Sequence, residues 1–156
     1  MPSMVLSSPI GDLTLTANDH AVTRLDFGAT APDGDPQGPA SPLLQEAARQ
    51  LAAYFSGTLR SFTLPLEPQG TPFQQKVWQA LQAIPYGKTA AYSDIARAIG
   101  NPRAMRAVGM ANHRNPLAIL IPCHRVVGKN GSLVGYGGGL PVKERLLALE
   151  KESKEA

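Results

Sequence analysis

The residues best suited to chemistry lie together in the short stretch Pro122-Cys123-His124-Arg125-Val126. Cys123 is the only cysteine of the chain, and it follows an apolar run that ends at Pro122. A thiolate is a soft nucleophile that attacks saturated carbon well, but a thiol with an ordinary pKa of about 8.5 is mostly protonated at neutral pH. Cys123 therefore needs a base or positive surroundings, and His124 is adjacent in sequence.

The apolar run before Cys123 predicts a buried strand that presents the thiol at the floor of a pocket. In an extended segment consecutive side chains point to opposite sides, so a direct bond between Cys123 and His124 is awkward. A water molecule between them would solve this, with Glu150 on the far side of the imidazole. We expect Glu150 in the last turn of the final helix, where a carboxylate opposes the helix dipole and so hints at another use.

The Pro-Cys-His-Arg-Val stretch resembles the active-site signature of the alkylguanine-DNA alkyltransferases, and the match takes in ordered motifs from about residue 71 to residue 150. The resemblance implies direct-reversal DNA repair by a methylated-DNA–protein-cysteine methyltransferase. Alkyl groups would pass irreversibly from O6 of guanine, and from O4 of thymine, to Cys123, once per molecule. It also implies the relay of Cys123, water, His124 and Glu150, and it implies no cofactor and no metal.

Other residues match positions that have a role in that family. Tyr92 matches a tyrosine that assists nucleotide rotation and donates to guanine N3, and Asn115 matches an asparagine that bridges the recognition helix and the active-site segment. Arg106 matches a finger that fills the place of the flipped nucleotide. The backbone carbonyls of Cys123 and Val126 would accept from the guanine amino group. The resemblance implies a substrate pocket of Pro122, Val126, Tyr136 and Gly137. Gly137 stands where some relatives carry serine, and Arg145 where many carry tryptophan.

Two short helices with a glycine between them are predicted as a helix-turn-helix. The first covers Ser93–Ile99 and is closed by Gly100, and Asn101-Pro102 caps and starts the second, which runs to about His113. Ala104, Ala107, Val108 and Ala111 form the packed side of the second helix. Its opposite face carries Arg103, Arg106, Met110, His113 and Arg114.

Charge supports a nucleic-acid partner. Residues 1–70 carry three Lys/Arg against seven Asp/Glu, a net charge of −4, whereas residues 71–156 carry twelve against five, a net charge of +7. A solvated basic face is the alternative, but with the helix-turn-helix we favour DNA contact. The resemblance implies double-stranded DNA containing O6-alkylguanine, bound through the minor groove with the help of Arg106 and Tyr92. From the basic face of the second helix we also expect Arg103, Arg114 and Met110 to contact the DNA. Flipping is required because O6 inside a duplex is out of reach of the thiol.

The elements that position these residues predict an α/β (α+β) fold in two domains. Residues 1–69 are expected to form a small sheet-plus-helix domain, ribonuclease-H-like by the resemblance. Residues 70–156 are expected to form a mostly helical, winged helix-turn-helix-like domain that binds DNA and accepts the alkyl group. The expected elements are strands Leu13–Ala17 and Val22–Phe27, a helix capped by Ser41 and stopped by Gly57, a helix capped by Thr71 with a stripe reaching Ile84, and a last helix from Pro141.

Composition bounds the function classes. The chain has 156 residues, of which 43% are hydrophobic and 17% charged, and no apolar run approaches the ~18 residues of a membrane span. One cysteine excludes an internal disulfide and a cysteine-rich zinc site. We expect a cytoplasmic monomer that does not bind membranes. The alternatives are a lesion-binding relative without the cysteine, a helix-turn-helix transcription factor and a cysteine hydrolase.

Overall fold

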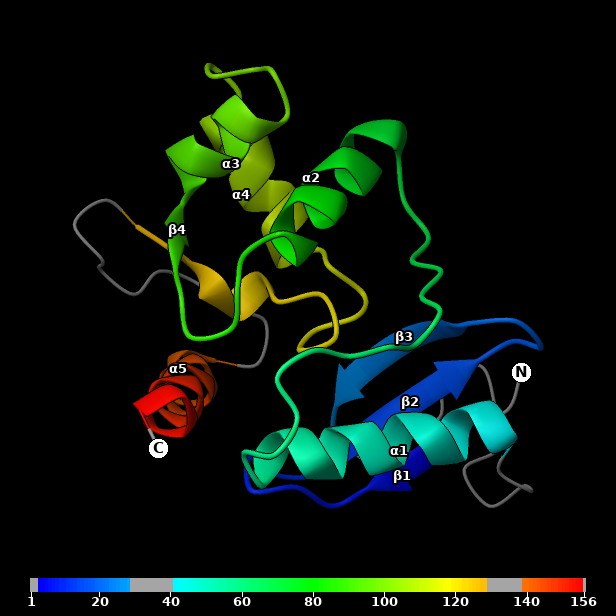
Figure 1. Ribbon diagram of the computed structural model, residues 1–156. Coiled ribbons are helices and arrows are strands. Elements are labelled where there is room, and N and C mark those ends of the chain that lie inside the picture. The colour runs from blue at the N-terminus through cyan, green and yellow to red at the C-terminus, as the bar shows by residue number, and fades with distance from the viewer. Residues whose placement is uncertain (1–2, 29–40, 129–138, 156) are drawn as a thin grey trace. The chain divides into compact units, whose positions relative to one another are not determined.

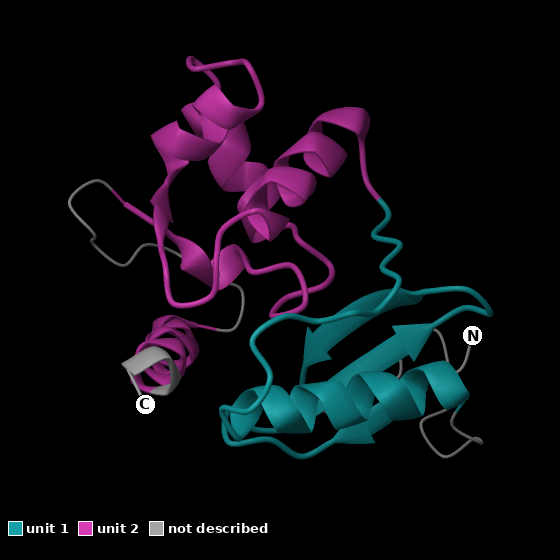
Figure 2. Cartoon of the chain, in the orientation of Figure 1, with its two compact units in different colours: residues 1–69 teal, residues 70–156 magenta. Residues whose placement is uncertain are grey.

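The computed structural model describes residues 3–28, 41–128 and 139–155 (Figure 1). The chain divides into two compact units, residues 1–69 and 70–156 (Figure 2). The first unit contains a three-stranded sheet and a helix, and the second consists mainly of helices. The predicted α/β fold class, with a small N-terminal sheet and a helical C-terminal part, is confirmed.

The first unit is an antiparallel sheet in the order β1 (Ser3–Leu6), β2 (Leu13–Ala17) and β3 (Val22–Phe27), packed against α1 (Pro42–Phe55). Strands β2 and β3 and the helix have the predicted bounds. Ser41 caps α1 by accepting a hydrogen bond from the Leu44 backbone N–H at 3.1 Å. The sequence did not predict β1, because four residues without clear alternation carry little strand signal.

The second unit begins with α2 (Pro72–Gln82), whose predicted capping box is present between Thr71 and Gln74. Ile84, expected in the stripe of this helix, is buried but follows the end of α2. Trp78 fixes α2 to the rest of the unit, because its indole Nε1 donates to the Ala111 carbonyl at 2.8 Å. The helices α3 (Tyr92–Ala98) and α4 (Met105–His113) pack against each other as the expected two-helix unit (Figure 1).

The start of α4 differs from the prediction. Asn101-Pro102 neither caps nor starts the helix, because the Asn101 N–H closes α3 on the Ala96 carbonyl at 2.9 Å. The next residues form a turn, in which the Ala104 N–H donates to the Asn101 carbonyl at 3.0 Å. Helix α4 therefore begins at Met105 without a side-chain cap. Consequently Arg103 precedes the helix and Arg114 forms its C-terminal cap.

The prediction of a buried strand before Cys123 is also wrong. Residues 117–121 fold into tight turns, with the Leu120 N–H bonded to the Ala118 carbonyl at 2.8 Å and Ile119 at a φ of 73°. A positive φ is rare for a β-branched residue. Asn115 stabilises the turns, because its side chain accepts from the Leu117 N–H at 3.0 Å and donates to the Ile121 carbonyl at 2.9 Å.

After these turns Cys123–Arg125 forms a short 3₁₀ helix, η1, and β5 (Val126–Val127) pairs in parallel with β4 (Ala90–Ala91). The last helix, α5 (Leu140–Glu155), packs against η1. Because α5 continues to Glu155, Glu150 does not lie in the last turn of this helix. The expectation that its carboxylate opposes the helix dipole was therefore wrong. Among the described residues, no helix is both long and apolar enough to cross a membrane.

Candidate active site

Cys123 lies at the start of η1 and is 5% exposed. Its backbone N–H donates to the Ile121 carbonyl at 2.7 Å across Pro122, which is buried as well. In a 3₁₀ helix successive side chains are about 120° apart. The alternation expected of an extended segment therefore does not apply to Cys123 and His124. The fold presents the thiol from a turn held at both ends by backbone and side-chain hydrogen bonds.

His124 and Glu150 meet as expected, and both are buried. The His124 Nε2 and Glu150 Oε2 atoms lie 2.6 Å apart. Burial lowers the pKa of His124 and outweighs the opposing effect of Glu150, so the resting imidazole is neutral. A carboxylate only accepts hydrogen bonds, so Nε2 carries the proton and Nδ1 keeps its lone pair. Among the described residues, Nδ1 has no hydrogen-bond partner.

Arg125 completes this network, although sequence reasoning gave it no role. It is 7% exposed, and its Nε and Nη2 atoms donate to the two carboxylate oxygens of Glu150 at 2.9 and 3.0 Å. Its third contact is from Nη1 to the Ile84 carbonyl at 2.7 Å. The Gly87 N–H donates to Glu150 at 3.3 Å. The negative charge of Glu150 is thus compensated on several sides, which permits its burial.

A second buried cation, Lys143, was also missed. It comes from α5 and has no exposed surface, and its Nζ donates to the Val126 carbonyl at 2.6 Å. Burial lowers the pKa of Lys143, and the charge of the Cys123 thiolate opposes that shift. Lysine is rarely buried, and nothing in the sequence around Lys143, one turn before Leu146, marked it as an exception. The lysine is near enough to interact electrostatically with Cys123.

Tyr92 and Asn115 both lie beside the segment that carries the thiol. Tyr92 is half-buried at the start of α3, and burial raises its pKa, with the charge of Cys123 adding to the shift and a hydrogen bond from Asn112 opposing it. Asn115 follows α4 and bonds the backbone at Leu117 and Ile121, so it links the helix-turn-helix to the active-site turns. Asn112 was not predicted from the sequence.

The expected basic face is exposed. Arg106, Met110 and His113 on α4 point to solvent, as do the flanking residues Arg103 and Arg114. Val108 and Ala111 are buried as predicted, whereas Ala107 is exposed. Of the expected pocket residues, Pro122 and Val126 are buried beside Cys123. Tyr136 and Gly137 lie outside the described residues.

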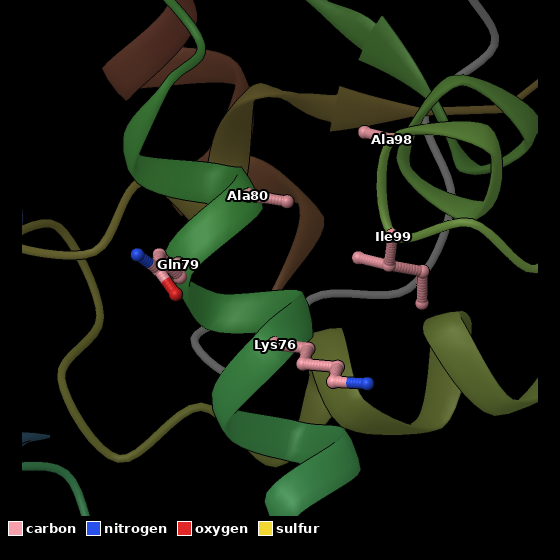
Figure 3. A pocket seen from close by; sticks show the side chains of 5 residues that line it. All are labelled: Lys76, Gln79, Ala80, Ala98 and Ile99. Atoms are coloured by element: carbon pink, nitrogen blue, oxygen red, sulfur yellow. The ribbon is translucent and has the colours of Figure 1, made fainter.

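A hollow of about 240 Å³ opens between α2 and α3 (Figure 3). Its lining residues are Lys76, Gln79, Ala80, Ala98 and Ile99. None of them belongs to the network around His124, so this hollow is separate from the candidate site. In the described part of the chain, no group of three or more His, Cys, Asp or Glu side chains is arranged to hold a metal ion.

Comparison with known proteins gives the same result for both units. The DNA-binding domain of 6-O-methylguanine DNA methyltransferase matches residues 72–152, and the ribonuclease-like domain of that family matches residues 3–68. A methylated-DNA–protein-cysteine methyltransferase of Methanosarcina barkeri is 51% identical over 96% of each chain. The constitutive enzyme of Bacillus subtilis is 46% identical over 94% of this chain and 93% of its own. Mycobacterium tuberculosis OGT, solved in complex with DNA, is 46% identical with a TM-score of 0.89, over 98% of this chain and 94% of that one.

Proposed function

The chain belongs to the 6-O-methylguanine DNA methyltransferase family, and we propose that it repairs O6-alkylated guanine in DNA by moving the alkyl group onto Cys123. One observation supports the roles of Cys123, His124 and Glu150. The only cysteine of the chain is buried next to a neutral histidine, whose Nε2 is bound by Glu150 and whose Nδ1 is available as a base. This arrangement suits a nucleophile that must be deprotonated before it attacks and that then keeps the transferred group.

The reaction follows from these groups. The Cys123 thiol loses its proton to His124 Nδ1, through a bridging water as the family resemblance implies, and Glu150 stabilises the imidazolium that forms. The thiolate then attacks the alkyl carbon as the bond between that carbon and O6 breaks. The electron pair stays on the base, which takes up the proton and becomes guanine. The protein keeps a thioether on Cys123, and each molecule acts once because the chain has no second thiol.

Buried cations assist the thiolate. Lys143 places a positive charge near Cys123, which favours the ionised sulfur, as nearby cations do for reactive cysteines. Arg125 serves a different purpose, since it neutralises Glu150 directly. The imidazole therefore faces a carboxylate whose orientation is fixed by the guanidinium. In this account Glu150 and Arg125 act through His124 and do not touch the substrate.

DNA is the proposed substrate-bearing partner, since a relative of this chain has been solved with DNA. We assign the contact to α4 and its flanks, entering the minor groove, with Arg106 filling the space of the flipped nucleotide. Arg103 and Arg114 would contact phosphates, Met110 would lie against the groove, and Tyr92 would assist rotation. Pro122, Val126, Tyr136 and Gly137 would line the pocket. Residues 1–69 would form the ribonuclease-like domain, and residues 70–156 the DNA-binding and acceptor domain.

The alternatives fit less well. A lesion-binding relative without the cysteine is disfavoured by Cys123 itself, and a transcription factor would leave the buried network of His124, Arg125 and Glu150 without a purpose. A cysteine hydrolase is disfavoured by the match of both units to the 6-O-methylguanine DNA methyltransferase family. Action on O4 of thymine, a monomeric state and a cytoplasmic location stay predictions.

Nucleoside analysis of the DNA tests the proposal. Duplex carrying O6-methylguanine is incubated with increasing amounts of protein, and the modified and unmodified bases are counted after digestion. We expect one lesion to be converted to guanine per protein molecule and none by Cys123→Ser. Conversion of many lesions per molecule, or release of free base in place of guanine within the strand, would refute acceptance by the cysteine.

A further inference from the structure

Asn112 is a buried polar residue of α4 that the proposed mechanism does not use. Its side chain is 3% exposed. The amide Nδ2 donates to the Cys123 carbonyl through a long hydrogen bond of 3.4 Å. The amide Oδ1 has no hydrogen-bond partner among the described residues. Buried polar groups are nearly always satisfied, so an amide kept with one open acceptor beside the reactive cysteine calls for a functional reason.

Tyr92 lies against the same part of α4. A Cβ atom placed on Gly109 would be 3.8 Å from Cε1 of the Tyr92 ring. Gly109 and Asn112 are three residues apart, so they are neighbours on the surface of the helix. A side-chain hydrogen bond from Asn112 to Tyr92 lowers the pKa of the phenol and partly offsets the effect of burial. The same amide that bonds the Cys123 carbonyl therefore also acts on the phenol of Tyr92.

We propose that Asn112 is a positioning residue, which sets the Tyr92 hydroxyl and the Cys123 carbonyl in register for the flipped base. This inference rests on the proposed function and names a further residue of that site. A carbonyl oxygen has two lone pairs, so the bond from Asn112 leaves one for the guanine amino group. Since the exposed side of α4 carries Arg106, a single helix connects the proposed DNA contact to both groups that would meet the base.

Asn112 differs from Asn115 in what it holds. Asn115 bonds the backbone of Leu117 and Ile121 and so stabilises the turns before the thiol. Asn112 reaches a side chain on α3 and the carbonyl of the acceptor residue itself. Loss of Asn115 should therefore damage the shape of the segment. Loss of Asn112 should act through Tyr92 and the Cys123 carbonyl and leave the fold intact.

The kinetic test is a double-mutant cycle with Asn112→Leu, which keeps the branching of the side chain and removes both the donor and the acceptor of the amide. Alkyl transfer from duplex is timed with saturating protein for Asn112→Leu, Tyr92→Phe and the double variant. We expect Asn112→Leu to slow transfer about tenfold, as for loss of one bond to a positioned group. In the Tyr92→Phe background the further loss should be clearly smaller, because only the bond to the Cys123 carbonyl remains to be lost.

A spectroscopic readout separates positioning from a general loss of structure. The protein is labelled with ¹³C at the tyrosine ring carbon that bears oxygen, and the Tyr92 signal is identified by its absence in Tyr92→Phe. We expect Asn112→Leu to move this signal. Val108→Ala, which removes apolar volume from the same buried side of α4, is the matched control and should leave the signal in place. Asn112→Ala supplies the same comparison if the leucine variant does not fold.

Two results would overturn the inference. One is a loss of transfer from Asn112→Leu that is equally large with the Tyr92 hydroxyl present and with it removed by Tyr92→Phe. The other is a Tyr92 signal that does not respond to either Asn112 variant. Failure of the unsubstituted protein to transfer alkyl groups would instead remove the proposed function. The Tyr92 signal would still decide whether Asn112 holds the phenol, so the two failures are distinguishable.

Discussion

Arg125 binds both carboxylate oxygens of Glu150, through Nε at 2.9 Å and Nη2 at 3.0 Å. The residues belong to different elements, η1 and α5, and both are buried. This fork-shaped contact fixes the plane of the carboxylate and compensates its charge. His124 therefore meets an acceptor of fixed orientation. Because this acceptor binds Nε2, the Nδ1 atom of His124 has no hydrogen-bond partner among the described residues.

Replacing Arg125 should lower the free energy of unfolding. Arg125→Met leaves a buried carboxylate without its main counter-ion, so we expect a loss of about 3–5 kcal/mol in the free energy of unfolding, measured with urea. Arg145→Met is the control, since Arg145 is exposed on α5 and should cost no more than about 0.5 kcal/mol. Similar losses in the two variants would mean that Arg125 is not the partner that allows Glu150 to be buried.

Glu150→Gln should slow alkyl transfer without abolishing it. The carboxylate raises the pKa of His124, so its loss leaves a weaker base. We expect transfer at neutral pH to fall about tenfold or more, with partial recovery at higher pH as the thiol ionises unaided. Transfer rates of Glu150→Gln are compared across pH with those of Glu152→Gln, an exposed residue of the same helix. A deficit that stays constant at all pH values would give Glu150 a purely structural role.

The buried imidazole also predicts how stability depends on pH. The folded-state pKa of His124 is lowered from 6.5, so the unfolded chain takes up this proton first. The contribution of neutral His124 to the free energy of unfolding is therefore complete above pH 6.5. Below pH 6.5 the free energy of unfolding falls by about 1.4 kcal/mol per pH unit, until the folded-state pKa is reached. His124→Gln should lack this loss, which urea titrations at several pH values measure. Glu46, with a pKa lowered to about 2 by Arg49, is common to both proteins. Parallel curves for the two proteins would contradict a neutral buried His124.

Local signals in the sequence predicted the elements whose ends are fixed by local chemistry. Ser41 and Thr71 cap the helices expected of them, and β2 and β3 follow their alternation. The apolar run before Cys123 was misleading because Asn115 bonds its backbone into turns, an interaction that periodicity does not encode. The prediction of where α4 starts was wrong for a similar reason, since Asn101 closes the preceding helix.

The site was predictable where resemblance or adjacency pointed to it, as for Cys123, His124 and Glu150. Arg125, Lys143 and Asn112 were missed because long polar residues and amides are usually exposed. Their burial depends on contacts with residues 11 to 41 positions away. The packing of α2 and α5 against η1, and the bond from Asn112 on α4 to Cys123, become visible only in the structure.

The arginines around α4 should fall into two classes. Arg106→Gly should reduce transfer from duplex far more than transfer from a free alkylated base, because only the duplex requires a nucleotide to be flipped and replaced. Arg103→Ala and Arg114→Ala should weaken binding to any duplex sequence and lower the salt slope by about one each. Transfer from both substrates and binding at several salt concentrations are measured for each variant. Equal losses of Arg106→Gly on duplex and free base would exclude the finger role.

We propose that Cys123 itself becomes the alkyl carrier, and intact mass spectrometry tests this most directly. The protein is weighed before and after mixing with duplex containing O6-methylguanine, and its peptides are then mapped. We expect a gain corresponding to one methyl group in place of a hydrogen, located on the peptide with Cys123 and absent from Cys123→Ser. Repair with no change in protein mass, or the same gain in Cys123→Ser, would contradict the account.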